Sequence, residues 1–301
     1  MRRTRILVSA VALGVSIGAC GAAATTAAKP SGPTIIIGSP DTTPQVIVAN
    51  LYAAALTQAG ARVTLQPATG TRASAESALT TGRLDLYPDE AGALLLSLDP
   101  DDTADATRIT TTVPALRRAL GPSGATVLDA APALDTEVFA VTRAMAAADH
   151  LTTLSSLASV ADTLILGGPP GCQTQPQCLM GLEHTYGLHF KSFTSLDDAG
   201  PVTVAALKGG EVQIAVLNAS DGSILRNGFV ALVDDKHLLE ADNLIPVIRT
   251  AVDTRLATGA LDRLSAQLTT DQLSELTIEV NQDHDAPGTV ARRWLARHHL
   301  I

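Results

Sequence analysis

Gly82-Arg-Leu-Asp-Leu-Tyr-Pro-Asp-Glu-Ala-Gly92 is the stretch of this sequence that says most about its fold. Gly82 is typical of the end of a helix, and the alternation around Leu84 and Leu86 predicts a short strand. The polar residues Tyr87 to Glu90 are then expected to form a tip in front of a leucine-rich helix. In open α/β sheets, ligands bind beyond the carboxyl ends of the strands, so this tip is a candidate ligand contact.

The same pattern returns between residues 206 and 222. Residues 206–210 resemble the end of a helix, Val212 to Leu217 predict a strand, and Asn218 to Gly222 form a second polar tip. One such unit early in the chain and one late predict an α/β protein with two lobes that face one cleft.

Length and composition narrow the class of protein. A chain of 301 residues can bury two cores, and Trp294 is expected to anchor the one formed by the C-terminal helices. The net charge of −9 argues against a nucleic-acid partner, which requires a basic face. Aromatic residues are scarce, with 4 Phe, 3 Tyr and 1 Trp, so a site built from aromatic walls has few residues to use.

The N-terminus is typical of an export signal. Three arginines precede the apolar residues 6–17, a run too short to span a bilayer. Ile17-Gly-Ala-Cys20 resembles the lipobox of bacterial lipoproteins, which implies a signal peptide over residues 1–19, a lipidated Cys20 and a flexible tether over residues 20–33. The protein is then expected on the outer face of the cell membrane. The alternative is an ordinary signal peptide with a chance cysteine.

The other two cysteines, Cys172 and Cys178, are separated by a short loop. Export places them in an oxidising compartment, which favours a disulfide between them. The alternative is a metal site, but this would need more ligands nearby, and the spacing of His184 and His189 does not suit a shared face.

Sequence motifs for catalysis are absent. The G-x-S-x-G match at Gly14 to Gly18 lies inside the predicted signal peptide and not in a strand–turn–helix context, and there is no H-E-x-x-H, no phosphate-binding loop and no dinucleotide fingerprint. We therefore expect neither an enzyme nor a cofactor. An anchored, secreted hydrolase is kept as an alternative, as is a structural or signalling lipoprotein without a ligand.

The turn before residue 45 has two interpretations. Thr43 is placed as the N-cap of a helix and Pro44 as its first residue, near the Asp41 carboxylate. The free backbone N–H groups at that helix end can serve plain capping or form a seat for a polar ligand, and the sequence leaves both open.

A series of motifs resembles the osmoprotectant-binding lipoproteins of ABC importers, the ProX- and OpuAC-like family that binds glycine betaine, choline, carnitine or proline betaine. In chain order the motifs are Ile36-Ile37-Gly38-Ser39, Gly70-Thr71-Arg72, Asp85-Leu86-Tyr87-Pro88 with Gly92, Asp135-Thr136, Tyr186-Gly187-Leu188, Ser220-Asp221-Gly222, Asp234-Asp235-Lys236-His237 and Pro246-Val247. The segment from Gly167 to Leu182 resembles a subgroup with a disulfide in this loop. The resemblance covers nearly the whole mature chain in the right order.

This resemblance implies a two-lobed type II periplasmic-binding fold, each lobe being a mixed sheet flanked by helices. Lobe I is expected over residues 34–136 and 243–301, and lobe II over residues 137–242, with a hinge of two crossovers. The implied partners are a small solute, an ABC permease and, through the anchor, the membrane. A monomer is expected.

The family's aromatic cage does not carry over to this chain. Family tyrosines correspond to Glu90, Glu137, Asn218 and Asp242, and a family arginine that would pair with a ligand carboxylate corresponds to Gln175. Ring faces attract a quaternary ammonium group without hydrogen bonds, whereas carboxylates and amides require donors. The sequence therefore predicts a hydroxyl-rich solute (a polyol, a sugar-like or a phenolic compound) or a small cation. The alternative is a solvated, degenerate cleft.

The candidate ligand contacts combine the polar tips, the first two turns and these replaced positions. They are Asp41, Thr43, Thr71, Arg72, Tyr87, Asp89, Glu90, Asp135, Glu137, Gln175, Asn218 and Asp242.

Overall fold

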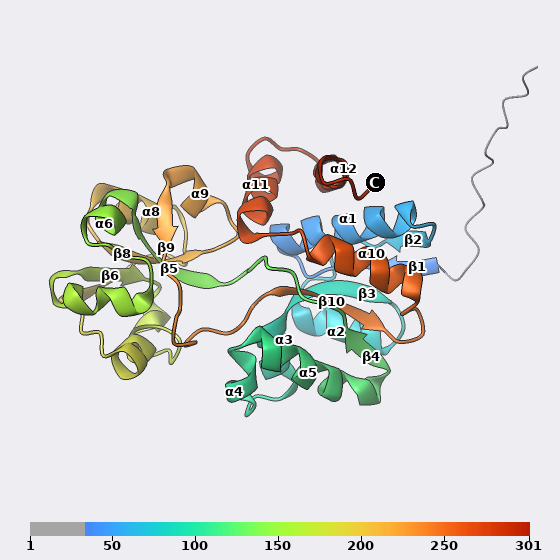
Figure 1. Cartoon of the computed structure of the whole chain (residues 1–301), viewed down its shortest axis with the longest axis horizontal. Helices are drawn as coiled ribbons and strands as arrows, with labels where there is room; N and C mark the ends of the chain where they lie inside the picture. The colour runs from blue at the N-terminus through green and yellow to red at the C-terminus, as the bar shows by residue number, and fades with distance from the viewer. Residues whose placement is uncertain (1–33) are drawn as a thin grey trace, which may run out of the picture.

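The structure is a computed structural model that describes residues 34–301, arranged as two lobes, each built on one five-stranded sheet (Figure 1). The predicted signal peptide (residues 1–19), the lipidated Cys20 and the tether (residues 20–33) lie outside the described residues. In the described part of the chain, no helix combines the length and the apolar character that crossing a bilayer requires.

Lobe I contains the sheet with strand order β2-β1-β3-β10-β4. Its strands are β1 (Thr34–Ile37), β2 (Arg62–Leu65), β3 (Leu86–Glu90), β4 (Ala125–Val127) and β10 (Leu244–Arg249). Strands β1, β2 and β3 are parallel, and β10 runs antiparallel to β3 and β4.

Lobe II contains the sheet with strand order β7-β6-β8-β5-β9. Its strands are β5 (Glu137–Thr142), β6 (Ile165–Gly168), β7 (Ser192–Ser195), β8 (Ile214–Asn218) and β9 (Phe229–Ala231). Strands β6, β7 and β8 are parallel, and β5 runs antiparallel to β8 and β9.

The two sheets share one plan. In each sheet the antiparallel strand is the one that arrives from the other lobe, namely β5 after the first crossover and β10 after the second. The crossovers pair with each other, because Asp135 N donates to Asp242 O at 3.1 Å and Leu134 forms a β-bridge with Asn243. The lobe boundaries at residues 136/137 and 242/243 remain our prediction.

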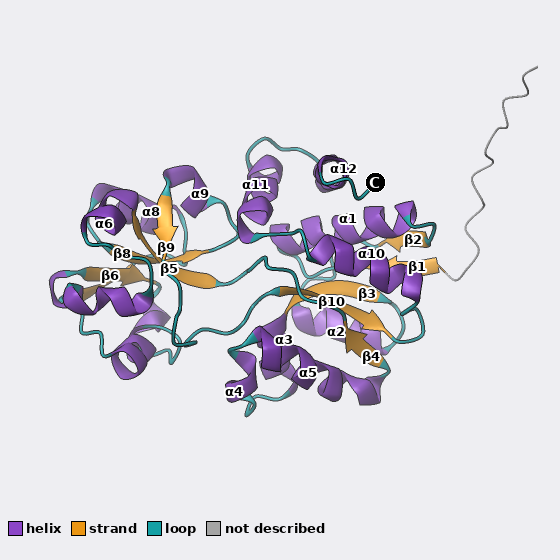
Figure 2. Ribbon diagram, in the orientation of Figure 1, coloured by secondary structure: helices purple, strands orange, loops and turns teal. Residues whose placement is uncertain are grey.

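Helices cover both faces of each sheet (Figure 2). In lobe I they are α1 (Thr43–Gln58), α2 (Arg72–Thr80), α3 (Ala91–Leu98), α4 (Thr103–Ala106), α5 (Ile109–Leu120), α10 (Arg255–Ser265), α11 (Thr270–Asn281) and α12 (Pro287–Arg297). In lobe II they are α6 (Arg143–Ala148), α7 (Leu179–Gly181), α8 (Pro201–Gly209) and α9 (Ser223–Asn227). Helix α1 is capped by Thr42, one residue earlier than expected, and the Thr42 hydroxyl accepts from Gln45 N.

Strand β3 begins and ends later than its sequence predicts. The expected tip, Tyr87 to Glu90, is itself the strand, and all five residues of Leu86–Glu90 are buried. Pairing with β10 keeps this segment extended, from Leu86 opposite Ile248 to Glu90 opposite Leu244. Because strand side chains alternate between faces, Leu86 packs under α1 while Tyr87 packs on the opposite face with α3 and α5.

The predicted disulfide between Cys172 and Cys178 is confirmed, with a Cα–Cα distance of 5.0 Å. Both cysteines are buried in the core of lobe II. The bridge closes the loop beside the crossovers, and Gly181 follows it where a Cβ would lie 2.0 Å from Pro176 O. Only glycine fits this close approach of two backbone segments.

Removing the disulfide is expected to destabilise lobe II. A Cys172→Ala/Cys178→Ala variant should lose about 2–4 kcal/mol of unfolding free energy, because the reduced unfolded chain gains entropy and the buried sulfurs are lost from the core. Urea unfolding followed by circular dichroism measures this. A loss below about 0.5 kcal/mol would show that the bridge contributes nothing to the folded lobe.

Helix α11 makes a third contact between the lobes, apart from the crossovers. Ser274 Oγ donates to Ala219 O at 2.9 Å, and this bond is buried. Gly222 has φ +87°, and a Cβ there would lie 2.4 Å from the Ile278 side chain. The polar loop after β8 therefore rests directly on a helix that belongs to lobe I.

Candidate functional site

A cleft lies between the lobes and consists of two adjoining cavities. The first, about 340 Å³, has a polar lining that includes Arg72, Glu90, Asp135, Glu137, Asn218 and Asp242. The second, about 500 Å³, shares Glu90, Asp135, Glu137 and Asn218 with the first. Its other polar residues include Thr43, Asp198, Ser220, Asp221 and Asn281. Both cavities have volumes in the range typical of small-molecule sites.

The fold places the polar side chains of the cleft at element ends. Glu90 ends β3 and Asn218 ends β8, which puts both at the carboxyl edge of a parallel strand. Glu137 begins β5 and pairs directly with Asn218. Asp135 and Asp242 lie on the two crossovers, so the cleft combines residues from both sheets and from the connections between them.

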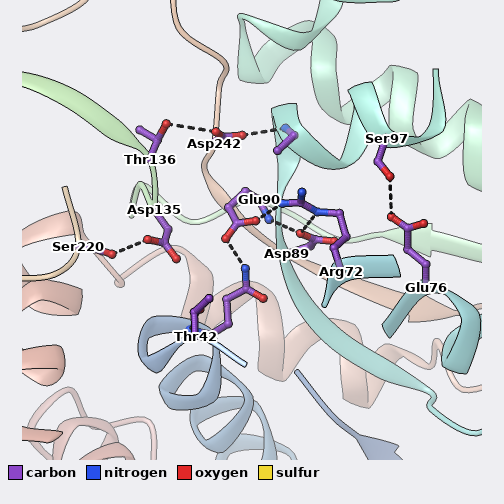
Figure 3. Close-up of polar contacts among 12 residues, drawn as sticks. Thr42, Arg72, Glu76, Asp89, Glu90, Ser97, Asp135, Thr136, Ser220 and Asp242 are labelled. Carbon is purple, nitrogen blue, oxygen red and sulfur yellow. Dashed lines mark hydrogen bonds and ion pairs between the residues drawn. The ribbon is translucent and has the colours of Figure 1, made fainter. Parts of the chain in front are cut away.

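A buried ionic cluster forms the lobe I wall (Figure 3). Arg72, the first residue of α2, donates from Nε to Asp89 Oδ1 at 2.7 Å and from a terminal nitrogen to Glu90 Oε2. Gln45 Nε2 donates to the other oxygen of Glu90. The guanidinium is thus held by two carboxylates, of which Asp89 is fully buried.

The two crossovers are tied by side-chain hydrogen bonds (Figure 3). Asp242 accepts from Ala93 N at 2.8 Å, near the start of α3, and from Thr136 Oγ1 at 3.2 Å. Asp135 accepts from Ser220 Oγ of lobe II at 2.5 Å. Asp135 of the first crossover is therefore bound to lobe II, and Asp242 of the second crossover is bound to lobe I and to the first crossover.

Burial changes the protonation of these carboxyl groups. Desolvation raises the pKa of Glu90 to about 7, and the neighbouring Asp89 carboxylate adds to this rise. Desolvation also raises the pKa of Asp242 to about 7 and that of Asp135 to about 6. The pKa of Glu137 rises through burial and through the nearby Asp198 carboxylate. The cleft therefore carries protons at a pH where surface carboxyls do not.

These shifts predict how stability depends on pH. The folded protein holds protons on Glu90, Asp135 and Asp242 that the unfolded chain, with ordinary carboxyl pKa values near ~4, releases. The contribution of these groups to the free energy of unfolding is thus fully present below about pH 4 and is lost as the pH rises to 7.

We expect Asp242→Asn to be more stable than wild type at pH 8 by on the order of 1–3 kcal/mol, and to gain little at pH 5. Urea unfolding at both values measures this, with the exposed Glu211→Gln as the control. An equal effect of Asp242→Asn at both pH values would contradict the expectation.

The structure brings most of the candidate residues to the cleft. Those that line it are Thr43, Arg72, Glu90, Asp135, Glu137, Gln175, Asn218 and Asp242. Four candidates line neither cavity. Tyr87 is fully buried in the lobe I core and Asp89 lies behind Arg72, because they belong to the body of β3 and not to its tip. Thr71 caps α2, and Asp41 is an exposed turn residue.

Sequence reasoning missed several residues of the cleft. Asp198 follows β7 and Glu240 precedes the second crossover, and no motif marks either. Gln45 supports Glu90 from the first turn of α1, a contact across 45 residues of sequence. Gln177 could have been found, because it lies in the same cysteine loop as Gln175 and donates to Glu240 at 3.0 Å.

Comparison with known families gives one match over nearly all of the described chain. Residues 33–297 match the family described as the substrate-binding domain of ABC-type glycine betaine transport systems. The chain belongs to this family. Family members are solute-binding proteins outside the cytoplasm that work with ABC permeases, and they are not enzymes. The resemblance and the type II fold class expected from the sequence are confirmed.

Solved structures agree with this family at the level of the fold. A glycine betaine/carnitine/choline ABC transporter protein superposes with a TM-score of 0.80 at 20% identity, over 88% of this chain and 99% of its own. YehZ of Escherichia coli in its apo form superposes with 0.81 at 21% identity, over 90% and 100%. A choline-binding protein in complex with choline reaches 0.53 at 13% identity, over 88% and 89%.

Proposed function

We propose that this protein is an exported lipoprotein that captures a small polar solute for an ABC permease by closing its two lobes. The family supports the receptor class, and the inter-lobe cleft supplies the site. Closure would bend the paired crossovers, where Asp135 and Asp242 already link the lobes. The solute would stabilise the closed form in proportion to its preference for that form.

The chemistry of the cleft supports a solute rich in hydrogen-bond donors. Among the described residues that line the two cavities, Phe139 is the only aromatic one, while the polar lining consists largely of carboxylate and amide oxygens. This acceptor-rich lining is the observation that carries the proposal. It suits the O–H groups of a polyol, a sugar-like or a phenolic compound better than the methyl groups of a betaine.

A thermal-shift screen of the purified protein tests this function. The panel contains glycine betaine, choline, carnitine, polyols, sugars and phenolic glycosides. We expect donor-rich solutes to raise the melting temperature and glycine betaine to leave it unchanged. Strong stabilisation by glycine betaine would overturn the proposed ligand class, and no shift with any solute would count against the receptor function itself.

The lipid anchor at Cys20, the tether over residues 20–33 and the monomeric state belong to the same proposal. Cys20 is the attachment point implied by the lipobox-like sequence before it. Labelling with a radioactive fatty acid should mark the wild-type protein and not Cys20→Ala. Equal labelling of both would remove the anchor from the proposal.

A further inference from the structure

The charges of the cleft are strongly one-sided. Across both cavities the acidic lining residues are Glu90, Asp135, Glu137, Asp198, Asp221, Glu240 and Asp242, and the only basic one among the described residues is Arg72. Arg72 is already bonded to Asp89 and Glu90. Those two carboxylates balance the charge of its guanidinium before any solute enters.

Several of the remaining carboxylates form no ion pair with a cation of the described protein. In residues 34–301, no Lys, Arg or His makes an ion pair with Asp135, Glu137 or Asp242. Asp135 and Asp242 receive hydrogen bonds from neutral groups only, at 2.5–3.2 Å. Asp242 is buried and Asp135 is half-buried, and desolvated carboxylates without a cation are costly, so a positively charged solute would relieve that cost.

We propose, resting on the solute-binding function above, that the cleft takes a small organic cation with N–H groups and no carboxylate, such as an alkyl diamine or an amino sugar. Ammonium hydrogens can bond to carboxylate oxygens directly, which a quaternary ammonium group cannot do. The described carboxylates do not converge on one point, because no three His, Cys, Asp or Glu side chains could hold a metal ion. They are spread along two cavities, and this suits an extended solute with more than one donor group.

The ion-paired Arg72 sets the second half of this specificity. A zwitterion such as a betaine needs a cation for its carboxylate, and the one arginine of the described cleft is already bound to Asp89 at 2.7 Å and to Glu90. A solute carboxylate would share this arginine with two acids that already balance its charge, and would also meet the acids that form no ion pair. The cleft therefore selects against carboxylates as well as for amines.

A cationic solute predicts a pH dependence that a neutral solute does not. The groups that face the solute from lobe I are Glu90 and Arg72 with Asp89 behind them; the crossovers add Asp135, Asp242 and Glu240, and lobe II adds Glu137, Asp198 and Asp221. Desolvation raises the pKa of Glu90 and Asp242 to about 7 and that of Asp135 to about 6 in the empty cleft. A bound cation favours the ionised forms and releases protons, so its affinity falls as the pH drops from 8 to 6.

Matched probes test the inference on the purified protein by isothermal titration calorimetry. One set is glucosamine, glucose and glucuronate; the other is putrescine, 1,4-butanediol and 4-aminobutyrate. We expect an amine to bind at least about tenfold more tightly than its neutral counterpart and the carboxylate-bearing members not to bind. Titrations in buffers of different ionisation enthalpy should show proton release for the amine only.

Glu137→Gln is the decisive variant. Glu137 lines both cavities. In the described structure the only side-chain hydrogen-bond partner of Glu137 is the neighbouring Asp198 carboxyl group. The change therefore removes charge without removing a support of the fold. We expect amine affinity to fall about fivefold or more, with neutral solutes unaffected. Glu211→Gln, exposed at the opposite end of β8 from Asn218, is the matched control and should bind as wild type.

The outcomes separate this inference from the function on which it rests. If glucose or butanediol bound as tightly as its amine, or if glycine betaine bound, the inference of a cationic, carboxylate-free ligand would be overturned. The solute-receptor function would remain. No binding by any amine, together with no response to any solute of the thermal-shift panel, would overturn both.

Discussion

Replacing Arg72 by methionine should destabilise the protein by about 2–4 kcal/mol at pH 7.5, because it leaves two neighbouring carboxylates without their cation. The Arg72 side chain is 29% exposed, whereas that of Asp89 is fully buried. Partial solvation of the arginine keeps the cost below that of a fully buried pair. The loss should shrink at pH 5, because Asp89 and Glu90, whose pKa values burial already raises, then take up protons.

Urea unfolding at pH 5 and pH 7.5 measures this effect, and two further variants complete the design. Arg118→Met removes an exposed arginine that lies 3.4 Å from Asp105, and should cost less than about 0.5 kcal/mol. Adding Asp89→Asn to Arg72→Met should recover part of the lost stability, since it removes the buried charge. An equal loss at both pH values would show that Arg72 acts by packing and not by charge.

Trp294→Ala should cost about 3–5 kcal/mol, because it opens the largest cavity that one substitution can make in lobe I. Trp294 is 2% exposed, belongs to the core beneath α1 and stacks on His298 with ring centroids 4.1 Å apart. Thermal unfolding followed by circular dichroism measures the loss. Trp294→Phe should lose less stability than Trp294→Ala. Leu256 is 45% exposed, and Leu256→Ala should lose less than about 1 kcal/mol of unfolding free energy. If Trp294→Ala melted like wild type, α12 would not be part of the lobe I core.

The two strand-and-tip units were visible in the sequence because their patterns are local. The extent of β3 was not, since its last residues are kept extended by β10, which lies more than 150 residues later in the chain. The sequence shows that Tyr87 lies near a strand end, but not which face of the sheet it joins. Pairing with β10 decides this and turns the ring into the core.

The residues of the candidate site also divide into those that sequence motifs reveal and those that depend on how distant segments pack. Motif comparison placed Glu90, Glu137 and Asn218 correctly at the cleft, because strand ends keep their positions in a fold even where side chains change. It could not find Asp198, which lines the cleft from the loop after β7, or Gln45, which supports Glu90 from helix α1, because both depend on how distant segments pack. It also could not show that Arg72 is bound by two acids, because the spacing of residues in the sequence does not determine which side chains meet in the fold.

The contact between α11 and the loop at Gly222 gives the two lobes a second point of attachment beside the paired crossovers. Two separate points of attachment define a line. Rotation of the lobes about this line keeps both attachments, whereas a twist about another axis strains one of them. A twist would have to break the buried Ser274–Ala219 hydrogen bond or push Ile278 into the Gly222 backbone. A closure that keeps this contact rotates the lobes about the line through the crossovers and the Gly222 loop, so that the opposing walls of the cleft meet in one register.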